Sequence, residues 1–337
     1  MSGLGHLLSK LNIEGGRRED NDFSEQLKAT EFSIFRPIAD FGYFSWEASG
    51  TYKSLSSIKT ANEILHHIDL DGTPNRLKSI RHIETPKRFE SPKSTAYKSK
   101  FPYSEIDIAC IHVAVKRGVK LDEVDFCFGG STLEMLAKKD ANEPFIVSRI
   151  PGSKCILVAK KKDYTQDLAD VGFQFERYVT GGSMLDTSGN PKNTEHIHTM
   201  RIGDKTVLFR AEVDASDADG SAIEIKASNP RYWGTKVMFQ MISSGSSKLC
   251  HGEKSRGVLT RVTLKSLSSV SQEALEYGNI SSLQKNIVKG MDAIQDQLKD
   301  GGTYRVCFTN GCLKLIPAST RVFGLFPPDH VVKALVD

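Results

Sequence analysis

The sequence predicts one large domain of the mixed α/β (α+β) class, in which a mixed β-sheet core is flanked by helices. Short β-branched and aromatic runs alternate along the chain with segments of helical periodicity. The chain has 337 residues, enough to bury a large core, and its hydrophobic content of 39% and charged content of 26% are ordinary for a globular protein. No internal repeat or low-complexity block interrupts this pattern.

Charge and cysteine usage narrow the functional classes. The net charge of +4 is only mildly basic, which permits nucleic acid as a partner without requiring it. The six cysteines are scattered without a C-x-x-C pair, which argues against a zinc ribbon or a redox motif. The N-terminus lacks the apolar run of a signal peptide, and no stretch is long enough to cross a membrane. We therefore expect an intracellular protein, nuclear or cytoplasmic, with free thiols and no membrane partner.

The N-terminal third combines a tail, a packed region and a basic stretch. Residues 1–28 are polar and predict a flexible tail, so that residues 29–337 form the domain. The aromatic-rich residues 32–52 should be packed, with turns at Pro37 and Gly42. Residues 71–100 hold eight Lys or Arg against three Asp or Glu. Taken alone, this excess favours a solvated loop, and the functional alternative is a patch that steers phosphate.

Periodicity predicts the remaining elements. Helices are expected over residues 105–117, 165–180, 233–243 and 281–299. Two strands within 144–160 should turn at Pro151 and Gly152, and residues 183–198 read as a polar loop with surface histidines. The strands expected at 205–215 and 222–227 should be adjacent and central, paired as a hairpin through the turn at 216–220.

Each of these last two strands carries two charged residues that are two positions apart. Glu212 and Asp214 share one strand face, and so do Glu224 and Lys226. In a hairpin, three carboxylates and one ammonium would converge. The acids would repel one another and raise each other's pKa values, a conflict that a bound divalent cation removes. Hard carboxylate oxygens suit Mg²⁺ or Mn²⁺.

A plain polar strand face would show the same alternation. Apolar residues frame both motifs, however, which favours central strands where unpaired charges are costly. Lys226 is also placed as in the acid-x-Lys half of the PD-(D/E)xK nuclease motif, where the lysine positions the attacking water and balances phosphate charge. The pattern thus predicts metal-dependent cleavage of phosphodiester bonds.

A third element, Gly172-Phe-Gln-Phe-Glu176, lies upstream. With Glu212-Val-Asp214 and Glu224-Ile-Lys226 it resembles the DXO family of RNA decapping and 5′-3′ exoribonuclease enzymes. That family carries Gly-Φ-x-Φ-Glu, Glu-Φ-Asp and Glu-Φ-Lys in this order, followed by a helical Gln that Gln240 matches. The resemblance covers roughly residues 32–335 and is strongest at 170–245; three linked motifs are far more specific than one.

The resemblance implies an activity and a set of site residues. The activity is hydrolysis at the RNA 5′ end: removal of incomplete or NAD caps or of a 5′-triphosphate, 5′-3′ exoribonuclease cleavage, or both, in RNA quality control. The implied partners are the RNA 5′ end and a 5′-3′ exoribonuclease, and the cofactor is Mg²⁺ or Mn²⁺. The metal would be held by Glu176, Asp214, Glu224 and the backbone carbonyl of Ile225, with Glu212 acting through coordinated water. Lys226 and Gln240 would contact the scissile phosphate or the attacking water.

One position departs from the family. An arginine is expected in a Trp-Arg-Gly-like run, and aligning Phe128-Gly129-Gly130 with that run puts Gly129 at its position. Glycine cannot give a phosphate a charge-assisted hydrogen bond. Either another cation compensates, with Lys138, Lys139 and Arg149 as candidates, or the chain is a catalytically weak or inactive protein that binds RNA or a partner.

Overall fold

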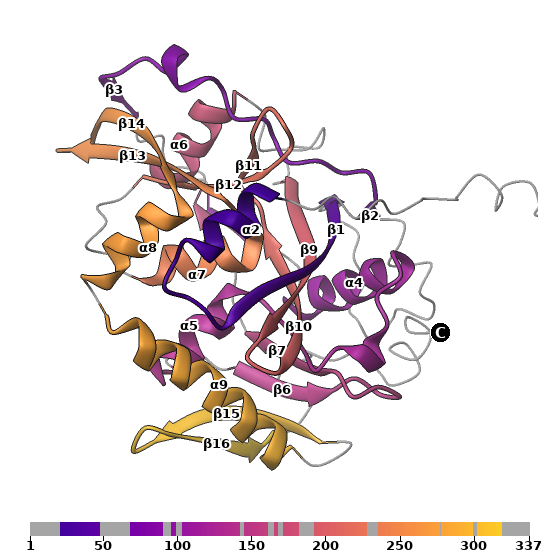
Figure 1. The fold of residues 1–337 in the computed structure, drawn as a ribbon. Coiled ribbons are helices and arrows are strands. Elements are labelled where there is room, and N and C mark those ends of the chain that lie inside the picture. Colours follow the sequence, from indigo (N-terminus) through magenta and orange to yellow (C-terminus); the bar gives the residue numbers. More distant parts are fainter. Residues whose placement is uncertain are drawn as a thin grey trace, which may run out of the picture.

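The computed structural model contains two large β-sheets with helices packed against them (Figure 1). It describes residues 21–47, 68–89, 96–98, 103–141, 145–160, 165–167, 171–181, 192–227, 235–276, 278–298 and 302–318. Residues 1–20 of the predicted tail (1–28), residues 48–52 of the aromatic stretch and residues 183–191 of the predicted loop (183–198) lie outside the described residues. Among the described helices, none is both long and apolar enough to cross a membrane.

The larger sheet has nine strands among the described residues, in the order β16-β15-β6-β7-β5-β10-β9-β1-β2. Strand β10 is central, parallel to β5 and antiparallel to β9, so the sheet is mixed. The strands are β1 (Phe35–Glu47), β2 (Ile68–Asp69), β5 (Phe126–Phe128), β6 (Phe145–Arg149), β7 (Ile156–Lys160), β9 (Lys192–Ile202), β10 (Lys205–Glu212), β15 (Thr303–Thr309) and β16 (Cys312–Pro317).

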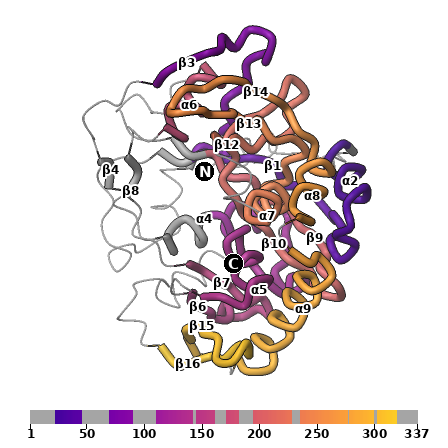
Figure 2. Tube along the Cα trace, turned by 90° about the vertical axis from the view of Figure 1, so that its left-hand side faces the viewer, coloured from indigo at the N-terminus to yellow at the C-terminus, as the bar shows by residue number. Residues whose placement is uncertain are grey.

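The second sheet has the order β11-β12-β13-β14-β3 in the described part of the chain. Figure 2 shows most of it at one end of the molecule, with β15 and β16 at the other end and α7 between. Its strands are β11 (Ala215–Ser216), β12 (Ala222–Lys226), β13 (Lys248–Ser255), β14 (Val258–Ser266) and β3 (Lys87–Arg88); β4 (Ala96–Lys98) and β8 (Thr165–Asp167) form a separate pair.

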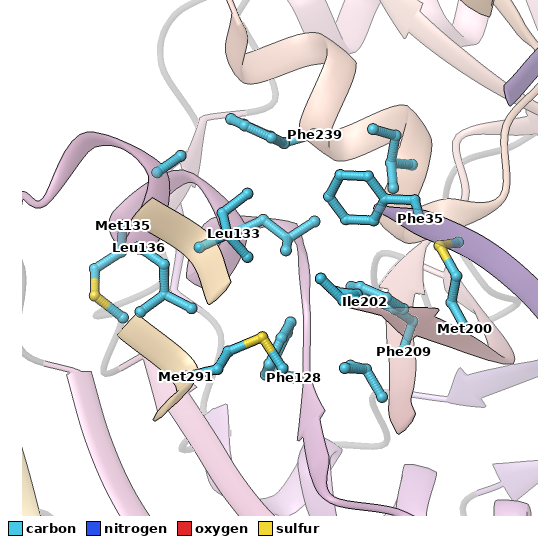
Figure 3. Close-up of a cluster of buried hydrophobic side chains, with 14 of the residues drawn as sticks. Phe35, Phe128, Leu133, Met135, Leu136, Met200, Ile202, Phe209, Phe239 and Met291 are labelled. Carbon is cyan, nitrogen blue, oxygen red and sulfur yellow. The ribbon is translucent and has the colours of Figure 1, made fainter. Parts of the chain in front are cut away.

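Helices cover both faces of the larger sheet because its central strands are apolar on both sides. Val207 and Phe209 of β10 pack into one hydrophobic cluster and Leu208 into another, on the opposite face. Figure 3 shows part of the first cluster, in which Phe128, Phe209 and Phe239 are labelled; the rings of Phe128 and Phe209 pack edge to face, with their centres 5.4 Å apart. The helices are α2 (Asn21–Lys28), α4 (Tyr103–Lys116), α5 (Gly130–Lys138), α6 (Val171–Thr180), α7 (Thr235–Ser244), α8 (Leu267–Leu275) and α9 (Ile280–Gln297).

The predicted fold class, a mixed sheet core flanked by helices in one domain, is confirmed. The helices expected at 105–117, 233–243 and 281–299 form within a few residues of their predicted bounds, and the strands within 144–160 form as β6 and β7. All six cysteines are free, and four of them are buried.

Several local predictions are wrong. Residues 21–28 are not tail but form α2, because Phe23 and Leu27 are buried in the main core. Residues 165–167 are a strand, and the helix begins only at Val171. His196 and His198 are not in a surface loop but buried in β9.

The prediction that residues 205–215 and 222–227 pair as a hairpin is also wrong. Strand β10 turns back on the preceding strand β9, starting from Lys205 opposite Ile202, so its two neighbours in the larger sheet are β9 and β5. Of the described segment from Lys205 to Ser216, only Ala215 and Ser216 pair with β12, in the other sheet. The chain therefore leaves one sheet after Glu212 and enters the next at Ala215.

Candidate active site

The acidic motif lies where the chain crosses between the two sheets. The amide of Val213 still donates to the carbonyl of Thr194 in β9, at 2.8 Å. One residue later, the Asp214 carboxylate accepts a hydrogen bond from the amide of Ile225 in β12, at 2.7 Å. That bond fixes Asp214 beside Glu224 and Lys226. The motifs meet as predicted, although by a sheet crossing and not by a hairpin.

Lys226 is paired with the acids around it. Its ammonium lies 3.5 Å from Asp214 Oδ2, forms an ion pair with Glu224, and donates to the carbonyl of Ile225 at 3.1 Å. Glu224 is only 3% exposed, so its charge needs a partner. Burial would lower the pKa of Lys226, but the charges of Asp214 and Glu224 outweigh burial and raise it.

Glu176 reaches the same group from α6. This helix packs onto the second sheet through Phe175 and Val179 and ends at Gly181, which has a φ of 65°. Burial, followed by the charge of Asp214, raises the pKa of Glu176 to about 9. Burial and Asp214 likewise raise the pKa of Glu224 to about 7.

Glu212, the last residue of β10, is the fourth acid. Partial burial, followed by the charges of Glu195 and Asp214, raises the pKa of Glu212, although the residue as a whole is exposed. Four carboxylates thus surround one lysine. The raised pKa values show that this group is short of positive charge.

A bound divalent cation would supply the positive charge that this group of carboxylates lacks. Carboxylate and carbonyl oxygens are the donors that Mg²⁺, Mn²⁺ and Ca²⁺ prefer. Within the described ranges no three acidic, histidine or cysteine side chains already stand at the spacing of a ligand shell. The ammonium of Lys226 lies between Asp214 and Glu224 and neutralises part of their charge.

Helix α7 brings Gln240 to the site. Eight of the ten residues of α7 are buried, so the helix is fixed against β10 and β12. The side-chain oxygen Oε1 of Gln240 is buried and has no hydrogen-bond partner in the described part of the chain. A buried acceptor without a donor is costly unless water or a ligand supplies the donor. The seven predicted site residues therefore come from α6, from the chain between the end of β10 and β12, and from α7, which packs against both of these strands.

Two further charged residues near the site were not predicted from the sequence. Glu195 is buried and lies opposite Glu212 in the register of β9 and β10, and its charge raises the pKa of Glu212. The alternation Glu195-His-Ile-His could have revealed this strand. Lys236 lies one helical turn before Gln240, and its charge acts on Glu224. The helical spacing of four was the available signal.

Gly129 adjoins this region without contributing charge. It directly precedes α5 and has a φ of −113°, which any residue can adopt. A Cβ there would lie 3.0 Å from the carbonyl oxygen of Arg210, near the acidic end of β10.

The cations expected to compensate lie elsewhere. Lys138 and Lys139 are at the far end of α5, about 13 Å along its axis, and Lys138 pairs with Glu134. Arg149 is in β6, three strand positions or about 14 Å from β10, and donates to the carbonyl of Lys154.

Part of the basic stretch at 71–100 runs beside α6. Lys78 donates to the carbonyl of Tyr178 at 2.9 Å, and the ammonium groups of Lys78 and Lys87 lie 5.5 and 5.6 Å from the centre of the Tyr178 ring. These contacts hold the segment on α6, so it is not a free loop. Its steering of phosphate stays a prediction.

Known proteins resemble this chain in their three-dimensional structure but not detectably in sequence. No protein-family model and no curated protein sequence matches the chain. Solved structures do match. Scheffersomyces stipitis Rai1, in complex with (3′-NADP)⁺ and a calcium ion, is 15% identical with a TM-score of 0.62, and the match covers 90% of this chain and 96% of that one.

Two further structures agree. Candida albicans Rai1, in complex with pU5 and Mn²⁺, is 13% identical with a TM-score of 0.61, over 88% of this chain and 94% of that one. K. lactis Dxo1, in complex with manganese, is 11% identical with a TM-score of 0.59, over 86% and 91%. The resemblance that the three motifs suggested therefore holds at the level of architecture: this chain has the fold of the Rai1 and Dxo1 proteins.

Proposed function

We propose that the chain is a metal-dependent hydrolase acting at the 5′ end of RNA. The observation that carries this proposal is the group of four acids, Glu176, Glu212, Asp214 and Glu224, gathered around Lys226 with an unpartnered Gln240 oxygen nearby. Proteins of the same fold have been solved with pU5 and Mn²⁺ and with a dinucleotide and Ca²⁺. A short-range cluster of acids with raised pKa values is typical of a functional site.

Each residue has a role in this proposal. Glu176, Asp214, Glu224 and the Ile225 carbonyl would hold a divalent cation, with Glu212 beside it; bound there, the cation would supply charge stabilisation for phosphoryl chemistry. Gln240 Oε1 can accept a hydrogen bond from the attacking water and orient it. Lys226, which now pairs with Asp214 and Glu224, can turn to the negative charge of the scissile phosphate.

The substrate class follows from the resemblance. We propose RNAs with defective 5′ ends, which are incompletely capped, NAD-capped or triphosphorylated, and 5′-3′ cleavage of the RNA body, as part of RNA quality control in the nucleus or cytoplasm. A 5′-3′ exoribonuclease is the proposed protein partner. Gly129 favours a second candidate, an RNA-binding or partner-binding protein with little turnover, because position 129 carries no charge beside the acids.

End-labelled RNAs that differ only in their 5′ ends test the proposal. Each would be incubated with Mg²⁺ or Mn²⁺ and wild type, Glu224→Gln, or the surface control Glu276→Gln. We expect cleavage by wild type and the control and none by Glu224→Gln, with Mn²⁺ binding followed separately by electron paramagnetic resonance. Metal and RNA binding without any cleavage would favour the binding protein. A wild type that binds neither Mg²⁺ nor Mn²⁺ would rule out the metal-dependent site.

A further inference from the structure

A group of cations lies on α6, on the side opposite Glu176. Successive residues of a helix are turned by about 100°, so Tyr178 and Glu176 point to nearly opposite sides of α6, and the exposed Arg177 points between them. On the Tyr178 side, the ammonium groups of Lys78 and Lys87 lie 5.5 and 5.6 Å from the centre of the tyrosine ring. Two lysines and one arginine thus form a basic surface around the outer side of this helix.

Tyr178 is held in place, so the two ammonium groups beside it have defined positions. Its hydroxyl donates to the carbonyl of Glu84 at 2.8 Å, and its ring packs edge to face against Phe89, with the ring centres 5.8 Å apart. Since both ammonium groups lie beside this one ring, at most about 11 Å separates them. The ring attracts each cation but carries no net charge, so the repulsion between the two lysines is not cancelled.

No carboxylate in the described part of the chain neutralises the basic surface. Lys78, Lys87 and Arg177 form no ion pair there, and residues 76–88 contain five exposed Lys or Arg against one Glu. The C-terminal end of α6 explains part of this excess, because Lys78 donates to a carbonyl of the last turn at 2.9 Å and Arg177 lies in that turn. It does not explain Lys87 or the other cations of the segment.

The segment that carries these lysines is joined to both elements that carry the acids. The amides of residues 78 and 77 donate to the carbonyls of Val179 in α6 and Ser216 in β11, at 2.9 and 2.8 Å. Helix α6 carries Glu176, and Ser216 follows Asp214 by two residues. At its other end the segment pairs with β14 as strand β3, and Figures 1 and 2 show β3, β14 and α6 together at one end of the molecule. An RNA strand that begins at the acids therefore has the basic surface within reach of its following nucleotides.

We propose that Lys78, Lys87 and Arg177 bind the RNA backbone downstream of the 5′ end. This binding site rests on the proposed function, because it requires the 5′ end to lie at the acids. Phosphates recur along the strand, so a row of cations can contact them without reading the sequence. The site makes affinity depend on RNA length: a short RNA that only fills the acidic site does not reach the basic surface, and a longer RNA does.

RNAs of two lengths test the site without requiring turnover. A diuridylate and a decauridylate, each with a 5′ phosphate, phosphorothioate linkages and a 3′ fluorophore, would be titrated with the full chain by fluorescence anisotropy at several salt concentrations in Mn²⁺. The variants are Lys87→Gln with Arg177→Gln, the charge-preserving pair Lys87→Arg with Arg177→Lys, and the matched control Lys285→Gln with Lys289→Gln, two exposed lysines of α9. Lys78 stays in place because it also caps α6.

We expect wild type to bind the decauridylate more tightly than the diuridylate. Removing both charges should weaken decauridylate binding about tenfold and make the slope of log K against log salt shallower by about 1.4, or about 0.7 for each phosphate contact. Diuridylate affinity should stay within about twofold, as should both affinities of the charge-preserving variant. The control should also stay within about twofold, since α9 lies away from α6 and salt screens distant charges.

An unchanged decauridylate affinity and salt slope in the double glutamine variant would overturn the site. An equal loss for both RNAs would overturn it too, because the two charges would then act on the 5′ end at the acids and not on the RNA downstream. Neither outcome depends on cleavage. A protein that binds the decauridylate through these cations and never cleaves RNA would contradict the proposed hydrolase and leave the binding site standing, and cleavage without the length dependence would do the reverse.

Discussion

Each ring nitrogen of His196 lies beside an oxygen atom that can accept a hydrogen bond. Nδ1 lies 2.7 Å from the carbonyl oxygen of Ser244, at the end of α7, and Nε2 lies 2.9 Å from the carboxylate of Asp40 in β1. Neither acceptor can donate, so both bonds form only if both nitrogens are protonated. His196 is then a buried imidazolium paired with Asp40, and the pair ties β1 and β9 to the helix that carries Gln240.

The Asp40 carboxylate should therefore contribute pH-dependent stability. Burial alone would raise its pKa, but the charge and hydrogen bond of His196 and a bond from the Gly42 amide hold the pKa at about 2, against 3.8 ordinarily. An acid whose pKa is lower in the folded than in the unfolded protein stabilises the fold at pH values above its unfolded pKa, here 3.8. This contribution disappears as the pH falls through about 2. Asp40→Asn should cost about 2–3 kcal/mol of unfolding free energy at pH 7 and progressively less below pH 4.

Urea denaturation of wild type and Asp40→Asn between pH 2 and 8 would measure this. The surface variant Asp122→Asn serves as the control and should stay within about 0.5 kcal/mol throughout. A loss for Asp40→Asn that is the same at every pH would mean that the ion pair is absent and that only packing was disturbed.

Gly129→Arg tests whether an arginine fits at position 129 and whether its charge strengthens RNA binding. The backbone permits a side chain, but its Cβ would press on the Arg210 carbonyl at 3.0 Å, so the neighbour must yield by a few tenths of an ångström. An arginine there would add a charged hydrogen bond to the RNA 5′ phosphate, so we expect RNA affinity to rise by about tenfold. An unchanged affinity in anisotropy titrations would show that another cation already serves the phosphate in the wild type.

The residues of the site were easier to predict from sequence than their surroundings. Asp214, Glu224 and Lys226 could be singled out because their motifs are local, a matter of residue type and a spacing of two, whereas Glu176 was identified by a family motif. Glu195 and His196 could not, since their roles depend on β9 pairing with β1 and β10, which brings in Asp40 from more than 150 residues away. Long-range pairing leaves no mark in a short window of sequence.

At the scale of elements, α6 depends on a glycine in the strand beneath it. A Cβ on Gly252 of β13 would lie 2.7 Å from Phe175 Cζ and 2.9 Å from Leu259 Cδ1, both in fully buried side chains. Gly252→Ala should force Phe175, and with it α6, away from the sheet, at a cost of about 1–3 kcal/mol in unfolding free energy. Since α6 carries Glu176, Mn²⁺ affinity should fall as well.

Denaturation and Mn²⁺ titration of this variant would be compared with Gly278→Ala, where the nearest atom lies 3.5 Å from the added Cβ. That control should lose neither stability nor metal affinity. A Gly252→Ala protein with wild-type Mn²⁺ affinity would show that α6 does not position a metal ligand.

Element prediction failed where tertiary contacts outweigh local composition. Residues 21–28 are polar overall, yet Phe23 and Leu27 are four apart and share a buried face, which is enough to dock a short helix. Helix α9 could be predicted because its apolar stripe is long, whereas β12 is too short to reveal its partners. Its true neighbours, β11 and β13, were therefore not predicted.

At the scale of the whole molecule, the acids come together only in the folded chain. Glu212 ends a strand of the larger sheet, Glu224 lies in the second sheet, and Glu176 comes from α6. An ion bound to them would bind the folded state and not the unfolded one. Binding then stabilises the molecule by RT ln(1 + [M]/Kd), about 2.7 kcal/mol when the metal is at a hundred times its Kd.

Adding Mn²⁺ should reverse which of the two proteins, wild type or Glu176→Gln, has the larger free energy of unfolding. Without metal, the pKa of its carboxyl is raised by burial and by its acidic neighbours, so Glu176→Gln removes an unfavourable group and should leave the protein as stable as wild type or more so. With saturating Mn²⁺, wild type should gain about 2.7 kcal/mol and the variant little, which makes wild type the more stable protein. Urea denaturation in EDTA and in Mn²⁺ measures both. Equal stabilisation of the two proteins by Mn²⁺ would place the ion at another site, because the variant lacks a ligand only here.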